Sequence, residues 1–200
     1  MSSLLLVVSS SSLTGAAAHA DTSLHEPYFT TISHPSFVSP HAQPIAVHGN
    51  SVFVVNTPSD TLDVIHAEGR HVLARVNVGV DPVSLAVRPD GKEVWVSNHV
   101  SDSVSVVDND ANSPTYLQII ATVQSFDRER KATSFDEPMA IAFADNTKAY
   151  VALSSDNEIA VVDVASRQVT KRLRITAQDP RAITVRNGKL YVLPFESNNK

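Results

Sequence analysis

One pattern returns four times along this chain of 200 residues. Each copy begins with a proline that is followed by a short apolar stretch, and the four prolines are Pro44, Pro82, Pro138 and Pro180. They lie 38, 56 and 42 residues apart. Because a unit of this length cannot bury its apolar faces alone, a tandem repeat with this period requires neighbouring copies to pack against one another.

The apolar stretches within each copy have the composition of β-strands. Second strands are rich in β-branched and aromatic residues, and third strands alternate polar and apolar residues. Residues that tolerate positive φ, such as Gly49 and Gly188, stand between the first and second strands, as tight hairpins demand. The expected first strands are residues 44–47, 82–87, 138–143 and 180–185; the second are 52–56, 94–98, 149–153 and 190–193; the third are 61–65, 103–108 and 158–163; residues 72–76 and 169–175 are fourth strands.

Four short strands repeated about every 40 residues predict an all-β fold, a β-propeller built of four-stranded antiparallel blades. Helical repeats of similar length would need a period of 3.6 residues, which this sequence lacks. The expected blades are residues 44–81, 82–137, 138–179 and, incomplete, 180–200. A seven-bladed ring would need about 290 residues, so we expect about three and a half blades and an N-terminal portion of a longer protein. The alternative is a ring closed by a second copy of the chain.

Residues 44–200 resemble the YVTN-type propeller repeat proteins of bacteria and archaea. The resemblance is carried by residues 54–65, 87–92 and 94–108. It implies a WD-like repeat architecture. It leaves the function open, because the blades of this family serve as binding scaffolds, surface-layer proteins and parts of haem-bearing or hydrolytic proteins.

The first 20 residues have the pattern of a secretory signal peptide. An apolar run is followed by small residues before Asp21, which predicts cleavage after Ala20 and a periplasmic or extracellular protein. A disordered Ser/Ala tail is the alternative. No stretch of the sequence reaches the length of about 18 apolar residues that a transmembrane helix requires.

Residues 21–43 form a lead-in that contains prolines and histidines. His34, His41 and His48 recur every seven residues, which on a helix would place three imidazoles along one stripe. The prolines of this segment exclude that helix, because each removes a backbone donor and favours extended geometry before it. We therefore expect an extended arm with solvated histidines rather than a metal site.

Composition excludes several kinds of chemistry. The chain has no cysteine, so these residues hold no disulfide, no thiolate zinc site and no covalently attached haem c. The net charge is −5 and the basic residues are scattered, which disfavours nucleic acid as a partner. Motifs for catalytic serine elbows, zinc proteases, phosphate loops and EF-hands are missing from the sequence.

Three carboxylates precede the prolines of successive copies and form the candidate site. They are Asp81, Glu137 and Asp179, and the loops that hold them are expected to surround one mouth of the central channel. Oxygen ligands from successive blades would suit a metal cation or a basic ligand. The alternative is that an acidic residue before proline ends the loop in extended geometry.

The second copy is longer than the others, and its extra residues are divided between a first loop, residues 109–114, and a second loop, residues 124–137. We expect the second loop to project over the channel face, since long loops on rigid scaffolds are where function concentrates. The alternative is a solvated surface loop that makes no contact with a partner. The candidate contact residues of this interaction loop are Phe126, Asp127, Arg128, Arg130, Lys131 and Phe135.

These observations predict an exported, non-catalytic scaffold that binds a protein or small-molecule ligand at the channel face. A first alternative is the propeller portion of a c-type haem oxidoreductase whose haem domain lies beyond Lys200. A second is a lactonase-like, metal-dependent hydrolase in which Asp81, Glu137 and Asp179 bind a divalent ion.

The repeat has a further irregularity at His66, which stands where the other copies have Asp108 and Asp163 at the end of the third strand.

Overall fold

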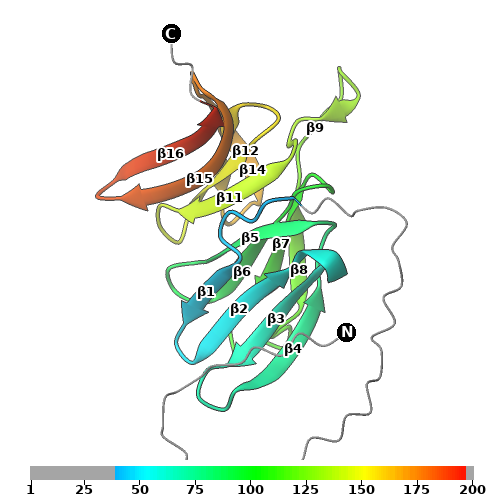
Figure 1. Cartoon of the computed structure of the whole chain (residues 1–200), viewed down its shortest axis with the longest axis vertical. Coiled ribbons are helices and arrows are strands. Elements are labelled where there is room, and N and C mark those ends of the chain that lie inside the picture. The colour runs from blue at the N-terminus through cyan, green and yellow to red at the C-terminus, as the bar shows by residue number, and fades with distance from the viewer. Residues whose placement is uncertain (1–38, 197–200) are drawn as a thin grey trace, which may run out of the picture. The chain divides into compact units, whose positions relative to one another are not determined.

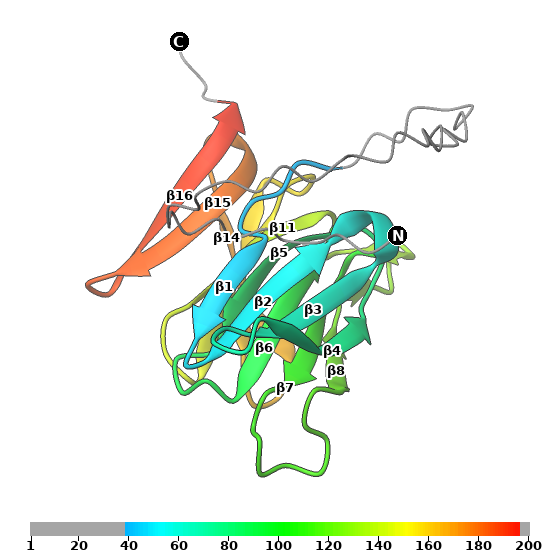
Figure 2. The same ribbon diagram turned by 60° about the horizontal axis from the view of Figure 1, so that its bottom comes forward.

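A computed structural model describes residues 39–196 of the chain and shows a series of antiparallel β-sheets in chain order (Figures 1 and 2). The expected all-β fold of propeller blades is confirmed. The signal sequence (residues 1–20), the lead-in up to residue 38 with His34, and residues 197–200 lie outside the described part. Among the described residues, no helix is long and apolar enough to cross a membrane.

Three sheets have four strands each, and in each the strands are adjacent in sequence order. These three sheets are named here blades 1, 2 and 3, and the two-stranded sheet that follows them is named blade 4. Blade 1 is β1 (Ile45–His48), β2 (Ser51–Asn56), β3 (Thr61–His66) and β4 (His71–Asn77), with a 3₁₀ turn, η1 (Thr57–Ser59), between β2 and β3. Blade 2 is β5 (Pro82–Val87), β6 (Glu93–Asn98), β7 (Ser103–Asp108) and β8 (Ile119–Val123). Blade 3 is β11 (Pro138–Phe143), β12 (Lys148–Leu153), β13 (Glu158–Asp163) and β14 (Gln168–Arg174). Blade 4 is β15 (Gln178–Arg186) and β16 (Lys189–Glu196), and a small hairpin of β9 (Phe126–Asp127) and β10 (Ala132–Thr133) precedes blade 3.

Local sequence explains the hairpins. In blade 4, Arg186 pairs with Lys189, so the loop is the two residues Asn187 and Gly188. Both have positive φ, of 52° and 70°. Two such residues form the tight turn whose twist matches that of the flanking strands.

The first strands of blades 2, 3 and 4 share a β-bulge directly after the proline. The register with the second strand shifts at this point, which leaves Val83, Met139 and Arg181 as the extra residues. A bulge bends its strand and redirects a side chain. In each of these blades, the bulge therefore takes the side chain of one residue out of the regular alternation of the strand.

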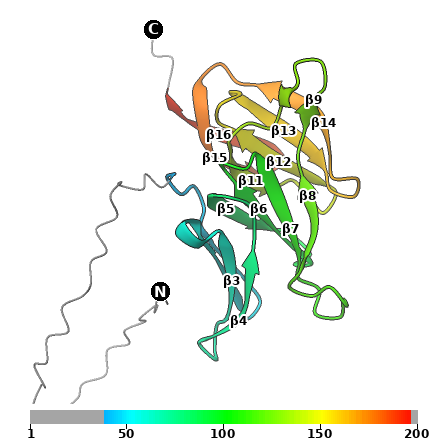
Figure 3. The ribbon, with the colours of Figure 1, turned by 90° about the vertical axis from the view of Figure 1, so that its right-hand side faces the viewer.

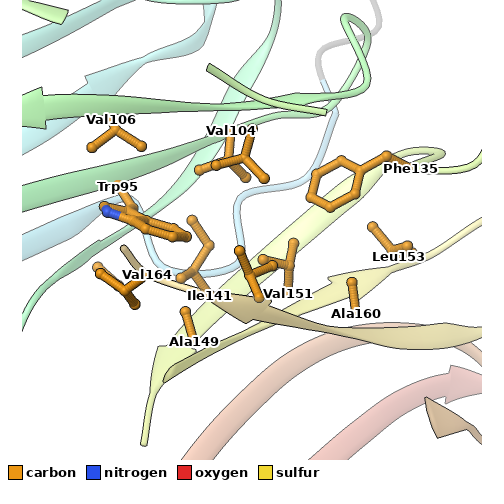
Figure 4. Packing of buried hydrophobic residues seen from close by; sticks show 13 residues of the cluster. Trp95, Val104, Val106, Phe135, Ile141, Ala149, Val151, Leu153, Ala160 and Val164 are labelled. Atoms are coloured by element: carbon orange, nitrogen blue, oxygen red, sulfur yellow. The ribbon is translucent and has the colours of Figure 1, made fainter. Parts of the chain in front are cut away.

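Apolar side chains fill the space between consecutive blades. Trp95 of blade 2 and Phe135 lie fully buried against Ile141 and Val151 of blade 3 (Figure 4). A second cluster between blades 1 and 2 contains Phe53, Leu62, Val64, Leu85, Val94, Val96 and Val107, and a third between blades 3 and 4 contains Ala140, Ala152, Ile159 and Ile183. The blades are thus held by burial between sheets, as the repeat requires.

Blades 1 and 4 each expose apolar side chains on one strand. Ile45 and Val47 on β1 are 51% and 65% exposed, and Leu193 and Phe195 on β16 are 67% and 66% exposed. Tyr191 is exposed beside them. Its equivalents in the repeat, including Trp95, lie between blades.

Candidate functional site

The three carboxylates before the prolines occupy equivalent backbone positions. Asp81, Glu137 and Asp179 have φ of 60°, 49° and 54°. The expectation of extended geometry at these positions is therefore wrong. The left-handed backbone is held by a contact between blades, because each residue's N–H donates to a side chain of the preceding blade. The acceptors are Oδ1 of Asp60 at 2.8 Å for Asp81, of Asp102 at 3.0 Å for Glu137 and of Asn157 at 2.7 Å for Asp179.

Two of these carboxylates line one pocket of about 280 Å³, named here the inner pocket. Its walls come from blades 2, 3 and 4 and from the segment before blade 1. The bulges of β11 and β15 direct Met139 and Arg181 to it. The lining residues are Pro40, His99, Glu137, Met139, Ser154, Asn157, Gln178, Asp179, Arg181 and Glu196.

Glu137 is held on one side of this pocket. Ser154 Oγ shares its one proton between two acceptors on the same residue, the Glu137 backbone oxygen at 3.0 Å and Oε2 at 3.2 Å. His99 Nε2 lies 3.9 Å from the same Oε2, and His99 Nδ1 is buried without a hydrogen-bond partner. The side chain of Glu137 is nevertheless 49% exposed, so its carboxylate is accessible to a ligand.

Asp179 and Arg181 form an ion pair on the other side, with Nη2 2.6 Å from Oδ2. The hydrogen bond to Asp179 raises the pKa of Arg181 above its ordinary value, with Glu137 contributing in the same direction. The guanidinium also lies 4.2 Å from the centroid of the Phe195 ring. Since Asp179 is neutralised by Arg181, the carboxylates of Glu137 and Glu196 give the pocket an excess of negative charge.

The structure does not place Asp81 in the inner pocket. Within residues 39–196, no group of three histidine, cysteine, aspartate or glutamate side chains could hold a metal ion. Asp81, Glu137 and Asp179 are therefore equivalent by backbone position without sharing one coordination sphere. His41, from the lead-in, is instead hydrogen-bonded to Thr57, with 2.7 Å between Nε2 and Oγ1.

The interaction loop forms the β9–β10 hairpin, and only part of it is available to a partner. Phe135 is fully buried in the cluster between blades 2 and 3, so its assignment as a contact residue is wrong. An aromatic ring at the end of this loop fills the gap between two sheets instead of facing solvent. Phe126 is 62% exposed, and Arg128, Arg130 and Lys131 are also exposed.

The hairpin also lies elsewhere than expected. The hairpin does not line the inner pocket, although Glu137 at the end of the same loop does. Asp127 and Arg130 share a separate pocket of about 360 Å³ with Arg172 and other residues of and beside the strands β13 and β14. Figure 3 shows β9 beside these strands. The Arg172 guanidinium donates to the Ser134 backbone oxygen, which fixes the base of the hairpin against blade 3.

His66 has a structural role that its neighbours explain. Its Nδ1 accepts a hydrogen bond from the Gly69 N–H at 2.8 Å, as Oδ1 of Asp163 accepts one from the Ser166 N–H at 2.8 Å. The histidine in blade 1 therefore caps the turn that the aspartate caps in blade 3, by accepting from the N–H three residues later in the chain. It also stacks on His71, with ring centroids 5.2 Å apart.

Sequence reasoning missed Arg181 and His99. Arg181 had a usable signal, because it stands directly after the proline where the equivalent residues, Val83 and Met139, are apolar. A charge at an otherwise apolar position of a repeat indicates a local difference in surroundings. His99 had no comparable signal.

Comparisons with known proteins support the fold. No protein-family model and no curated protein matches the sequence. Among solved structures, the chain is similar to a hydrazine synthase of Kuenenia stuttgartiensis, with 27% identity and a TM-score of 0.66 over 84% of this chain and 46% of that one. It is also similar to the Cps50 (Swd1) β-propeller domain of Myceliophteria thermophila, with 14% identity and a TM-score of 0.61 over 77% and 48%. The chain thus spans about half the length of these two structures. The resemblance to YVTN-type repeats stays a prediction.

Proposed function

We propose that this chain is a non-catalytic binding scaffold that holds a small basic ligand in the inner pocket. The observation that carries the proposal is the charge of that pocket. Three carboxylates, those of Glu137, Asp179 and Glu196, line it together with a single guanidinium, that of Arg181. Because Arg181 already pairs with Asp179, an ammonium or guanidinium group would find Glu137 and Glu196 as its partners.

The pocket suits binding better than catalysis. Ser154 Oγ directs its proton to Glu137 rather than to a histidine base, so Ser154, His99 and Glu137 are not arranged as a serine–histidine–acid relay. The site draws on three consecutive blades, which is typical of ligand sites at the mouth of a propeller channel. A metal-dependent hydrolase finds no support in the described residues, since they gather no metal ligands.

Titration with n-butylammonium and n-butyrate, monitored by NMR amide shifts at low ionic strength, tests this proposal. We expect saturable shifts around Glu137, Asp179 and Glu196 with butylammonium only. Glu137→Gln should weaken this binding by about threefold to tenfold. Glu68→Gln removes an exposed carboxylate in blade 1 and serves as the matched control. Equal or tighter binding of butyrate would contradict the proposed ligand class.

A second candidate is that the chain is the propeller portion of an enzyme, in particular of a c-type haem oxidoreductase. The likeness to part of a hydrazine synthase favours it. Covalent haem c needs cysteines, so the haem domain of such a protein would lie beyond Lys200. An intact mass and an absorption scan of the protein from its native source test this candidate. A longer chain with a Soret band supports it, and a colourless protein contradicts it.

The localisation that accompanies both candidates is export, directed by residues 1–20. The interaction loop supplies a second contact surface in this proposal, with Phe126, Arg128 and Lys131 as its exposed residues. A protein partner would contact the outer side of blade 3 there, away from the inner pocket.

A further inference from the structure

Residues 39–43, named here the strap, run across the inner strands before the chain enters blade 1 (Figure 1). The Ala42 N–H donates to the Val83 oxygen at 3.1 Å, and the Leu85 N–H donates to the Gln43 oxygen at 2.9 Å. Gln43 and Ser84 form a parallel bridge. The strap therefore adds to the free edge of β5, the first strand of blade 2.

A side chain fastens the strap to blade 1. Thr57 is buried, and its hydroxyl donates to the Pro82 oxygen at 2.7 Å. Because a threonine hydroxyl has one proton, Oγ1 can only accept from His41. His41 therefore donates through Nε2–H, across 2.7 Å, and this bond links the strap to the junction of blades 1 and 2.

The other end of the strap reaches blades 3 and 4. Ala42 packs against the apolar cluster that contains Ala140 and Ile183. Pro40 lines the inner pocket with residues of blades 3 and 4, including Glu137 and Glu196. One wall of the pocket is thus supplied by a short segment with few bonds, whereas the other walls come from strands and inter-strand loops of blades 2, 3 and 4.

We propose that the strap is a gate of the inner pocket. When its bonds to Thr57 and β5 open, Pro40 leaves the pocket, which becomes wider and more accessible. When they close, Pro40 stands in the wall of the pocket that Met139 also lines and limits which ligands enter. Segments held by few contacts open locally without unfolding of the whole domain. This inference rests on the proposed function only for the ligand; the movement itself concerns the strap and the blades.

The first test is hydrogen exchange of the full chain, comparing the wild type with His41→Ala. Loss of the His41–Thr57 bond should accelerate exchange of the Ala42 and Leu85 amides at least about fivefold, while Val151 on β12 keeps its protection. His71→Ala, which removes an exposed imidazole from blade 1, is the matched control and should change neither amide. Equal exchange of Leu85 in the wild type and His41→Ala would overturn the gate.

The second test uses the absence of cysteine from the chain. Met139→Cys places a single thiol at a position that is 2% exposed and lines the pocket. Its reaction with a thiol reagent should accelerate at least about fivefold when His41→Ala is added. Ser155→Cys, at an exposed position, should react at the same rate in both backgrounds. An unchanged rate for Met139→Cys would overturn the gate, even where Leu85 loses protection.

The two proposals fail in different ways. Faster labelling of Met139→Cys together with no binding of butylammonium would support the gate and overturn the basic ligand. Tight butylammonium binding with an affinity and a labelling rate that His41→Ala leaves unchanged would support the ligand and overturn the gate.

Discussion

Arg167 of blade 3 donates through Nη2 to Oε1 of Glu93 in blade 2, across 2.6 Å. The same carboxylate accepts from Arg88 Nη1 at 2.6 Å and from Trp95 Nε1 at 2.8 Å. The Arg167 guanidinium lies 5.4 Å from the centroid of the Trp95 ring. The side chain of Glu93 is only 8% exposed. One buried carboxylate thus joins two blades at the end of the apolar cluster that Trp95 belongs to.

Replacing this carboxylate should weaken the junction. Glu93→Gln keeps the size of the side chain but leaves the partly buried guanidiniums of Arg88 and Arg167 facing a neutral amide. We expect a loss of about 2–4 kcal/mol in the free energy of unfolding, because a charged hydrogen-bonded partner is removed from a buried site. Urea unfolding followed by Trp95 fluorescence measures it. Glu68→Gln, on the exposed turn of blade 1, is the control, and an unchanged midpoint for Glu93→Gln would show that the junction contributes nothing.

The two phenylalanines of the interaction loop should behave differently. Phe135 is fully buried between blades 2 and 3, whereas Phe126 is 62% exposed. Phe135→Ala leaves a cavity and should cost about 3–5 kcal/mol of stability. Phe126→Ala should leave the thermal midpoint nearly unchanged. Similar midpoints for the two variants would mean that the loop end does not belong to the core.

The blades could be predicted because their signals are local. Pro82 and Pro138 begin first strands as expected, and a turn such as Asn187-Gly188 fixes a hairpin from two neighbouring residues. Strand type and order therefore follow from short stretches of sequence. Comparison of the repeats shows that His66 is irregular, because that needs only the sequence. Its role as a turn cap depends on the geometry of the folded turn.

The site could be predicted only in part, because its geometry depends on contacts between blades. The left-handed backbone of Glu137 is held by Asp102, which lies 35 residues earlier in the chain. The usual preference before proline is overridden by this distant acceptor. Likewise, the local sequence places Phe135 in a loop, and only packing between blades 2 and 3 buries its ring. Glu137 and Asp179 line one pocket while Asp81 does not, and neither this difference nor the strap follows from repeat position alone.

Export can be checked at the new N-terminus. Cleavage after Ala20 predicts that the protein secreted by its native host begins with Asp21. N-terminal sequencing of that protein measures it directly. Ala20→Asp should block processing and leave a longer chain, since signal cleavage requires small residues. A secreted protein that retains residues 1–20 would contradict the prediction.

Two aspartates of blade 3 should respond to pH with opposite signs. Burial, together with Asp136 and Glu158, raises the pKa of Asp156, although the Asp136 N–H and Arg172 act the other way. The charged form of Asp156 is therefore unfavourable in the folded protein. By contrast, hydrogen bonds from the hydroxyl and N–H of Ser166 lower the pKa of Asp163.

Asp156→Asn should accordingly be more stable than the wild type at pH 7, where the cost of the charge is fully present. This advantage should shrink as the pH falls through the raised pKa toward the ordinary aspartate value of about 4. Asp163→Asn should instead be less stable at pH 7, and its deficit should disappear only as the pH falls below about 4. Urea midpoints measured from pH 7 to pH 3 compare the two. A lower midpoint for Asp156→Asn than for the wild type at pH 7 would show that its bonds to Asp136 and Arg172 outweigh the burial of its charge.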